Sequence, residues 1–131
     1  MKKYDITNVV FKGYVHDVAH IWKNNHLLLL PSRMEGQALA LIEAMWCYRG
    51  VVITDVGGAR ELITDGETGF IAVNPAVGDI DNALEKAWSL RDQWEKIGRN
   101  AGRKIREIYQ DDPIASFTQE IESVFNKIPA I

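Results

Sequence analysis

The feature that most constrains the fold is the run Leu27–Leu30, which is apolar at every position and ends at Pro31. A short run without polar alternation is typical of a strand covered on both faces, as in a parallel sheet. Similar runs at 9–11, 51–54 and 70–73 are separated by stretches whose apolar residues are three or four apart, as in amphipathic helices. The sequence therefore predicts an α/β fold in which about four parallel strands alternate with helices.

The helices are expected in two groups. Those between the strands fall at 17–25, 37–48 and 60–63, and those after the last strand at about 79–90, 92–108 and from Pro113 onward. Asp79 or Asp81 can cap the first helix of the second group. Right-handed crossovers place the helices between strands on one face, so the terminal helices, or another copy of the chain, must cover the other face.

Composition narrows the class of protein. The chain has 131 residues, the size of one domain, and 15 Lys and Arg against 18 Asp and Glu give a net charge of −3, which argues against a nucleic-acid binder. A single cysteine, Cys47, excludes an internal disulfide and a zinc site built from cysteines. No apolar run approaches the roughly 20 residues of a membrane span, and no signal-peptide core follows the start. We expect a cytoplasmic, soluble chain.

Ligands of open α/β sheets bind beyond the carboxyl ends of the strands, so the loops at those ends are the candidate site. The loops at 13–16, 31–36 and 54–58 are polar or contain glycine, as a ligand cleft requires. The segment from 38 to 48 is apolar except for Glu43, which predicts a buried helix carrying one acid. A buried carboxylate needs a partner, and two remain open: an ion pair with an arginine such as Arg33 or Arg60, or a ligand hydroxyl.

A second acid, Glu35, precedes the same helix, and capping does not explain it because Glu is a poor N-cap. Gly36 lets the backbone approach a ligand closely. The helix start around 36–38 offers free N–H groups and the positive end of the helix dipole, which suit a phosphate. Two carboxylates beside a phosphate fit best as acceptors for hydroxyl groups on either side of it. A phosphate flanked by two hydroxyl-bearing groups is the description of a nucleotide sugar.

These segments carry a resemblance to a known family. Residues 31–36, 41–45, 51–58, 61–63 and 65–70 resemble the donor-binding domain of retaining glycosyltransferases of the "glycosyl transferases group 1" family, which have the two-domain B-type fold. The family's two Glu separated by seven residues are matched by Glu35 and Glu43. The resemblance implies a Rossmann-like parallel sheet flanked by helices, an incomplete half of the donor-binding domain.

The resemblance also implies a role for each matching residue. Glu35 would be the catalytic residue and bind hydroxyls of the transferred sugar, and Glu43 would bind the ribose of the nucleotide. Backbone amides would contact the sugar and the diphosphate, and two residues after the first strand would lie near the nucleobase. The amides are those of Gly36, Gln37, Ala38 and Leu39, and the nucleobase residues are Tyr14 and Val15.

The function implied is transfer of a hexose from a nucleoside diphosphate sugar to a sugar or lipid-linked acceptor with retention of configuration, as in polysaccharide or lipopolysaccharide biosynthesis. No metal and no cofactor besides the donor substrate are implied. The full-length protein is expected in the cytoplasm, with peripheral contact to the inner face of the membrane. The alternative is a noncatalytic nucleotide-sugar-binding or interaction module. A phosphate-receiver domain is excluded because the second strand ends in Pro31-Ser32 rather than an acidic residue.

By the same resemblance, residues 1–131 are the C-terminal nucleotide-sugar-binding portion, without the acceptor domain and the first donor-domain strands. We expect such a chain to be inactive alone. If it folds alone, its first strand at 9–11 is expected to pair with 27–30 in a four-stranded sheet, and the chain is expected to self-associate.

Several residues depart from the family pattern or have simpler interpretations. Ala38 stands where the family usually has Pro or Gly, and Tyr48 stands where it has Gly at a helix end, so Gly50 is expected to take over the turn. Asp79-Ile80-Asp81 matches a metal-binding pattern but is interpreted as a helix cap. His16 follows the nucleobase loop. The cluster Arg99, Arg103, Lys104 and Arg106 is interpreted as a solvated helix face, with contact to anionic lipids as the alternative.

Overall fold

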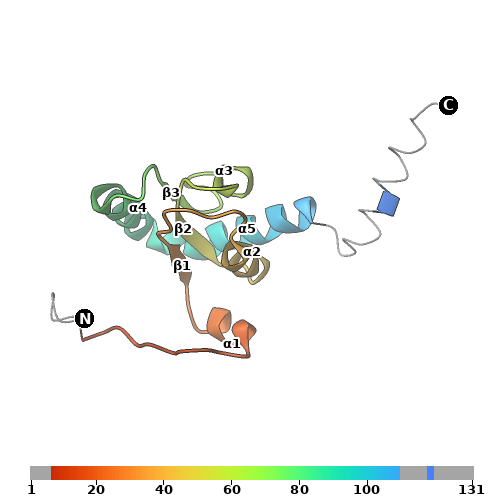
Figure 1. Ribbon diagram of the computed structural model, residues 1–131, viewed down its shortest axis with the longest axis horizontal. Helices are drawn as coiled ribbons and strands as arrows, with labels where there is room; N and C mark the ends of the chain where they lie inside the picture. The colour runs from red at the N-terminus through yellow and green to blue at the C-terminus, as the bar shows by residue number, and fades with distance from the viewer. Residues whose placement is uncertain (1–6, 110–117, 120–131) are drawn as a thin grey trace.

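The computed structural model describes residues 7–109 and 118–119. Three strands, β1 (Leu27–Leu30), β2 (Gly50–Thr54) and β3 (Phe70–Ala72), form one parallel sheet in the order β1-β2-β3 (Figure 1). The helices are α1 (Val18–Lys23), α2 (Leu39–Trp46), α3 (Ala59–Leu62), α4 (Val77–Ser89) and α5 (Trp94–Ile108), with a 3-10 turn η1 (Arg91–Gln93) before α5. The predicted α/β, Rossmann-like architecture with a parallel sheet is confirmed.

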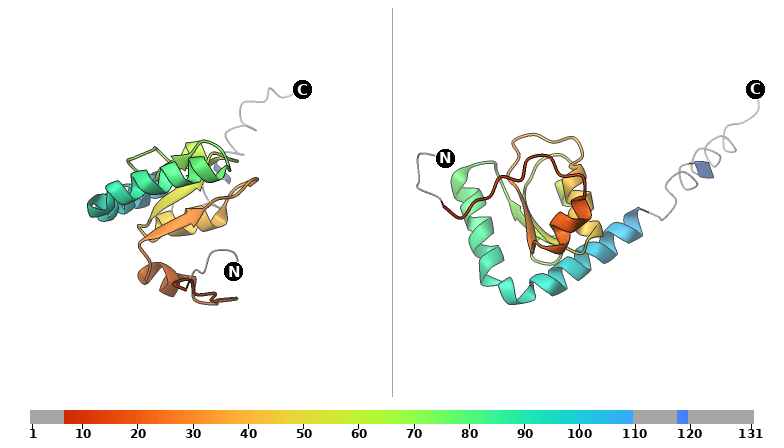
Figure 2. Two further views of the ribbon diagram at one scale, coloured as in Figure 1. Left: turned by 90° about the vertical axis from the view of Figure 1, so that its left-hand side faces the viewer. Right: turned by 90° about the horizontal axis from the view of Figure 1, so that it is seen from below.

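The central strand β2 is buried at all five positions, and its alternating side chains separate two halves of the core. Val51 and Ile53 pack on one face with buried residues of α2, α3 and the later part of α5. Val52 packs on the other face with buried residues of β3 and α4 and with Ile97 at the start of α5. Figure 2 shows α4 along one side of the sheet and a sharp bend between α4 and α5. The prediction that a terminal helix covers the second face is therefore confirmed.

The predicted strand at 9–11 is wrong, and so is the four-stranded sheet. Residues 7–17 form no strand, and Phe11 is 80% exposed. The free edge of β1 offers little burial on the α4 side, since Leu29 within β1 is itself 45% exposed. Strand propensity is realised only where side chains pack against neighbours, and at this edge one face lacks them.

Two helix boundaries differ from the sequence prediction. Helix α2 begins at Leu39, two residues later than expected, and α4 begins at Val77, two residues before Asp79. Asp79 therefore lies in the first turn of α4, where its carboxylate accepts a hydrogen bond of 2.9 Å from the Asn74 side chain, and neither Asp79 nor Asp81 is the cap. The helix predicted from Pro113 falls outside the described residues apart from 118–119.

The turn between α2 and β2 is made by Tyr48, which adopts the left-handed conformation with φ of 57°. The expectation that Gly50 would take over this turn is wrong, because Gly50 is buried in β2, where a Cβ would lie 2.8 Å from the Leu27 side chain. Helix α5 crosses directly over Tyr48. A Cβ at Gly98 would overlap the Tyr48 carbonyl, and one at Gly102 would overlap its ring. Only glycine fits at these two positions of α5.

Candidate functional site

A pocket of about 290 Å³ opens at the carboxyl ends of β1 and β2, where the sequence places a ligand site. One wall comes from the loop after β1 and the start of α2, and the other from the end of β2, the loop that follows it and α3. The lining residues are Gly36, Gln37, Ala38, Leu41, Ile53, Val56, Gly58, Ala59, Glu61 and Leu62.

Glu35 is half-buried beside this pocket, and its carboxylate is held in place from within the same loop. The Ser32 hydroxyl donates a hydrogen bond of 2.6 Å to Glu35 Oε1. The Thr54 hydroxyl, at the end of β2, donates in turn to the Ser32 carbonyl oxygen. Within the described residues Oε2 of Glu35 has no hydrogen-bond partner, so one carboxylate oxygen is fixed and the other is available to a ligand.

The two loops of the pocket touch through their backbones at Gly57. Gly57 has a φ of +57°, and a Cβ there would lie 2.5 Å from the Gly36 carbonyl oxygen and 2.7 Å from that of Glu35. A side chain at this position would therefore force the loops apart in addition to the strain of the left-handed conformation. The loop after β2 thus packs directly against the backbone of Glu35 and Gly36.

The start of α2 presents N–H groups that the rest of the described chain does not use. Ala38 occupies the N-cap position and offers no side-chain cap. No described residue accepts a hydrogen bond from the N–H groups of Gly36, Gln37, Ala38 or Leu39. A Cβ at Gly36 would meet no atom within 4 Å, so open space adjoins this glycine. Free N–H groups at the positive end of a helix dipole suit an anion such as a phosphate.

Glu43 is exposed, and the prediction that it is a buried acid is wrong. Helix α2 buries Leu41, Ala44 and Met45, while Glu43 lies on its open side with Leu39, which is 69% exposed. A helix of apolar residues is buried all round only where other elements cover every side of it, and the described chain covers only one side of α2. Among the described residues, neither Arg33 nor Arg60 forms an ion pair with Glu43. Arg60 instead pairs with Asp55 at 2.6 Å. Glu43 does not line the pocket, and its carboxylate remains open to a ligand.

The structure does not bring the two expected nucleobase residues into the pocket. Tyr14 is 85% exposed, and its ring contacts the His16 ring with centroids 4.8 Å apart. Val15 is half-buried, and like Tyr14 it is absent from the pocket wall. Both belong to the segment that failed to join the sheet, so their place beside the donor loop depends on a strand that does not form here.

The second wall was predicted only in part. The sequence places the loop at 54–58 in the candidate cleft without assigning a role to Val56 or Gly58, and it gives no place there to Glu61, although all three line the pocket. Glu61 sits close to Gly58, with its carboxylate 3.5 Å from the Cβ position of that glycine.

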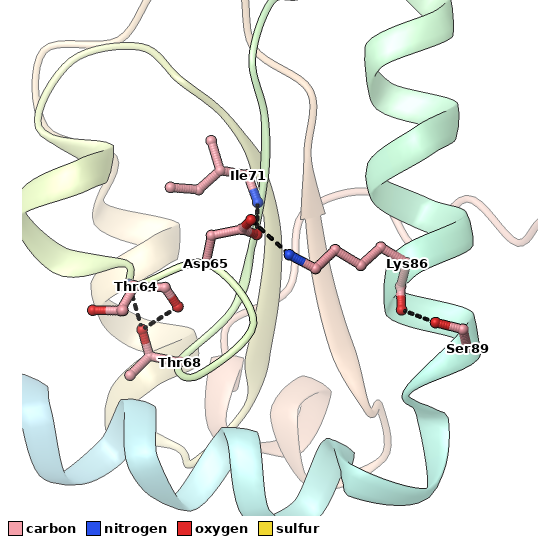
Figure 3. A network of polar contacts seen from close by, with 6 residues as sticks. All are labelled: Thr64, Asp65, Thr68, Ile71, Lys86 and Ser89. Carbon is pink, nitrogen blue, oxygen red and sulfur yellow. Dashed lines mark hydrogen bonds and ion pairs between the residues drawn. The ribbon is translucent and has the colours of Figure 1, made fainter.

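The motif at 65–70, which contributes to the family resemblance, lies at the amino end of β3 and away from the pocket. Asp65 accepts one hydrogen bond from the Ile71 N–H at 3.0 Å and another from the Lys86 ammonium at 2.7 Å (Figure 3). The Thr68 hydroxyl accepts from the Thr64 N–H at 2.8 Å. These contacts tie the loop before β3 to α4, so the role of this motif is structural.

In 7–109 and 118–119, no group of three or more His, Cys, Asp or Glu side chains could hold a metal ion. None of the helices in this part of the chain combines the length and apolarity needed to cross a membrane.

Comparison with known proteins decides the family. The family model described as "Glycosyl transferases group 1" matches residues 1–104. The chain belongs to the glycosyl transferases group 1 family. The resemblance drawn from the sequence is thus confirmed, and the sheet with its helices is part of a B-type glycosyltransferase fold.

Individual members of the group 1 family are similar to the chain over limited parts of their length. It is 39% identical over 84 residues to D-inositol 3-phosphate glycosyltransferase of Gordonia bronchialis, covering 64% of this chain and 18% of that protein. It is 32% identical over 118 residues to N-acetyl-alpha-D-glucosaminyl L-malate synthase of Bacillus anthracis, covering 89% and 30%. The chain thus spans less than a third of these curated relatives.

A solved structure supports the fold. Anabaena HepE in complex with UDP matches with a TM-score of 0.72 at 23% identity, over 90% of this chain and 32% of HepE. At this level of identity the match shows the shared fold.

Proposed function

We propose that the chain is the donor-binding part of a retaining glycosyltransferase that moves a hexose from a nucleoside diphosphate sugar to a sugar or lipid-linked acceptor. Family membership supports the transferase reaction. The observation that carries the donor class is the set of unpartnered N–H groups at Gly36–Leu39, beside the carboxylate of Glu35 and at the pocket mouth. Donors of this kind combine a diphosphate, which needs N–H groups, with sugar hydroxyls, which need carboxylate acceptors.

Each group has a definite task in this proposal. Negative charge develops on the departing diphosphate, and fixed N–H donors at the start of α2 stabilise it without rearrangement. The free oxygen of Glu35 accepts a hydroxyl of the transferred hexose and orients the ring as it gains positive charge. Glu43, about one turn along α2 from Leu39 and exposed, accepts hydroxyls of the ribose. The helix start and its N–H groups supply electrostatic stabilisation of the diphosphate.

The test is ligand-observed NMR of the 131-residue chain with UDP-, GDP- and ADP-glucose, using Glu43→Gln and, as a matched control, Glu67→Gln. Glu67 is also an exposed acid, but it lies in the loop before β3, away from the pocket. We expect binding of at least one donor, weakened about ten-fold by Glu43→Gln and unchanged by Glu67→Gln. Equal weakening in both variants, or no binding by the folded chain, would overturn the proposal.

A noncatalytic binding module is the second candidate, because the same N–H groups and carboxylates would hold a donor without transferring its sugar. Under the first proposal the chain alone is inactive, and a protein that also contains an acceptor domain turns over. Acceptor-dependent release of the nucleoside diphosphate by such a longer protein, lost in Glu35→Gln, supports the enzyme. Donor binding without acceptor-dependent release by that protein supports the binding module.

A further inference from the structure

The loop that carries the free N–H groups is tied to the end of the last described helix. The side-chain amide of Gln37 donates a hydrogen bond to the hydroxyl oxygen of Tyr109, the residue that follows α5 and lies 72 positions along the chain. Gln37 lines the pocket, whereas Tyr109 does not. Tyr109 and Ala38, the neighbour of Gln37, both pack against the same buried cluster.

Tyr109 is itself held in a defined place relative to α2. Its N–H donates to the Ile105 carbonyl at 2.9 Å, and Ile105 is fully buried. One turn earlier Arg106 donates to the carbonyl of Trp46, the last residue of α2, at 2.9 Å, and its guanidinium stacks on the Trp46 ring at 4.3 Å. Helix α5 thus holds the end of α2 through Arg106 and the loop before α2 through Tyr109.

The loop has few other anchors. Its first half is fixed from β2, where Thr54 holds Ser32 and Ser32 holds Glu35. Its second half contains the unpartnered N–H groups. Among the described residues, the side-chain hydrogen bond that anchors this half is the one from Gln37 to Tyr109. The other restraints near it are the backbone contact of Gly36 with Gly57 and the packing of Ala38 on the buried cluster.

We propose that Tyr109 is a positioning residue for the donor site, acting through Gln37 to hold the N–H groups of Gly36–Leu39 in the geometry that receives a diphosphate. This inference rests on the proposed function. Tyr109 does not touch the donor. It removes the cost of ordering the loop when the donor binds, and such preorganisation raises affinity without adding a contact to the ligand.

The first readout needs no ligand. Tyr109→Phe removes only the hydroxyl group that accepts the hydrogen bond, and Gln37→Leu removes the side-chain amide that donates it. Each variant therefore breaks the same bond. We expect the ¹⁵N order parameters of the Gly36, Ala38 and Leu39 amides in the free chain to fall in either variant and no further in the double variant. Order parameters in buried β2 stay unchanged, which distinguishes loosening of the loop from general destabilisation.

The control is Lys104→Gln, on the same helix. Lys104 donates a hydrogen bond of 3.1 Å to the Thr64 hydroxyl and so ties α5 to the loop at the opposite edge of the sheet. This variant should leave the order parameters at Gly36–Leu39 as in the parent. Unchanged order parameters there in Tyr109→Phe, or a fall that extends equally into β2, would overturn the positioning role.

The second readout is donor affinity, measured by titration with the nucleoside diphosphate glucose that binds the parent chain. We expect Kd to rise about five-fold in each single variant and no further in the double variant. Independent, multiplying effects would overturn the inference. If no donor binds the folded parent, the proposed function fails, and the amide order parameters alone decide the role of Tyr109. If donors bind and Tyr109→Phe alters neither the order parameters nor Kd, the proposed function stands and the positioning role fails.

Discussion

Gly36 lies in the pocket wall and Gly57 in the loop that touches it, and the two are glycines for different physical reasons. Gly57 is required by the fold, because it combines a left-handed backbone with contact to the carbonyls of Glu35 and Gly36. Gly36 has open space where a side chain would be, so the folded chain alone does not require it. Under the proposed function, this open space at Gly36 is where the donor lies.

This difference gives a first prediction. Gly36→Val should leave the melting temperature within about 2 °C of the parent, since no described atom opposes the side chain, yet abolish donor binding by filling the space next to the free N–H groups. Gly57→Ala should lower both stability, by about 1–3 kcal/mol, and binding. Thermal unfolding with a donor titration of each variant checks this, and a Gly36→Val chain that still binds donors normally contradicts it.

A second prediction concerns the carboxylate held by Ser32. Glu35→Gln keeps the shape of the side chain but removes its charge, and should lower kcat/KM of a protein containing both domains by about 100-fold or more. Ser32→Ala removes only the bond that fixes Oε1 and should cost about ten-fold or less. Steady-state kinetics of both variants is the measurement. If kcat/KM fell equally in the two variants, the position of the Glu35 side chain rather than its charge would matter, and the prediction would be contradicted.

At the scale of single residues, the sequence located Glu35 and Gly36 correctly beside the pocket because chain adjacency to a strand end and a helix start determines their place. It misjudged the burial of Glu43. A helix pattern reports which side chains are apolar, whereas burial depends on which other elements cover each side of the helix. That information lies in packing between distant segments, as does the contact of Gln37 with Tyr109.

At the scale of elements, the crossing of α2 and α5 is set by the glycines under Tyr48. Gly98→Ala should destabilise the chain by about 1–3 kcal/mol, because its Cβ would overlap the Tyr48 carbonyl and the helix must shift. Gly78→Ala is the matched control: Gly78 is also in a helix, and a Cβ there would meet nothing within 4 Å. It should stabilise by about 0.5–1 kcal/mol. Urea unfolding of both variants checks the sign of each change, and a neutral Gly98→Ala would contradict the close crossing.

Strand prediction succeeded where an apolar run is buried on both faces and failed where it is not. The runs at 27–30, 51–54 and 70–73 match β1, β2 and β3 within about a residue or two at each end. The run at 9–11 is also apolar throughout, but the edge of β1 beside which it would pair is not covered on both faces. The predicted cap at Asp79 failed for a local reason, since the start of α4 at Val77 carries no side-chain cap that a sequence pattern would reveal.

At the scale of the whole molecule, the free edge of β1 predicts self-association. An edge strand presents unpaired backbone groups, and the exposed side chains of Leu29, Val10 and Phe11 add apolar surface on the same chain. We expect oligomers that grow with concentration in light scattering, and a shift toward monomer in Leu29→Lys, which places a charge on the edge strand. A strictly monomeric parent chain across the concentration range contradicts this prediction.

The central claim is that the start of α2 is a diphosphate site, and backbone amide chemical shifts test it most directly. Spectra of the ¹⁵N-labelled chain would be recorded with and without UDP-glucose and GDP-glucose. We predict that the largest shifts fall on the amides of Gly36, Gln37, Ala38 and Leu39, with smaller shifts around Gly57. Shifts concentrated instead on the basic face of α5 around Arg99 and Arg103, or none at all in a folded chain, would contradict the claim.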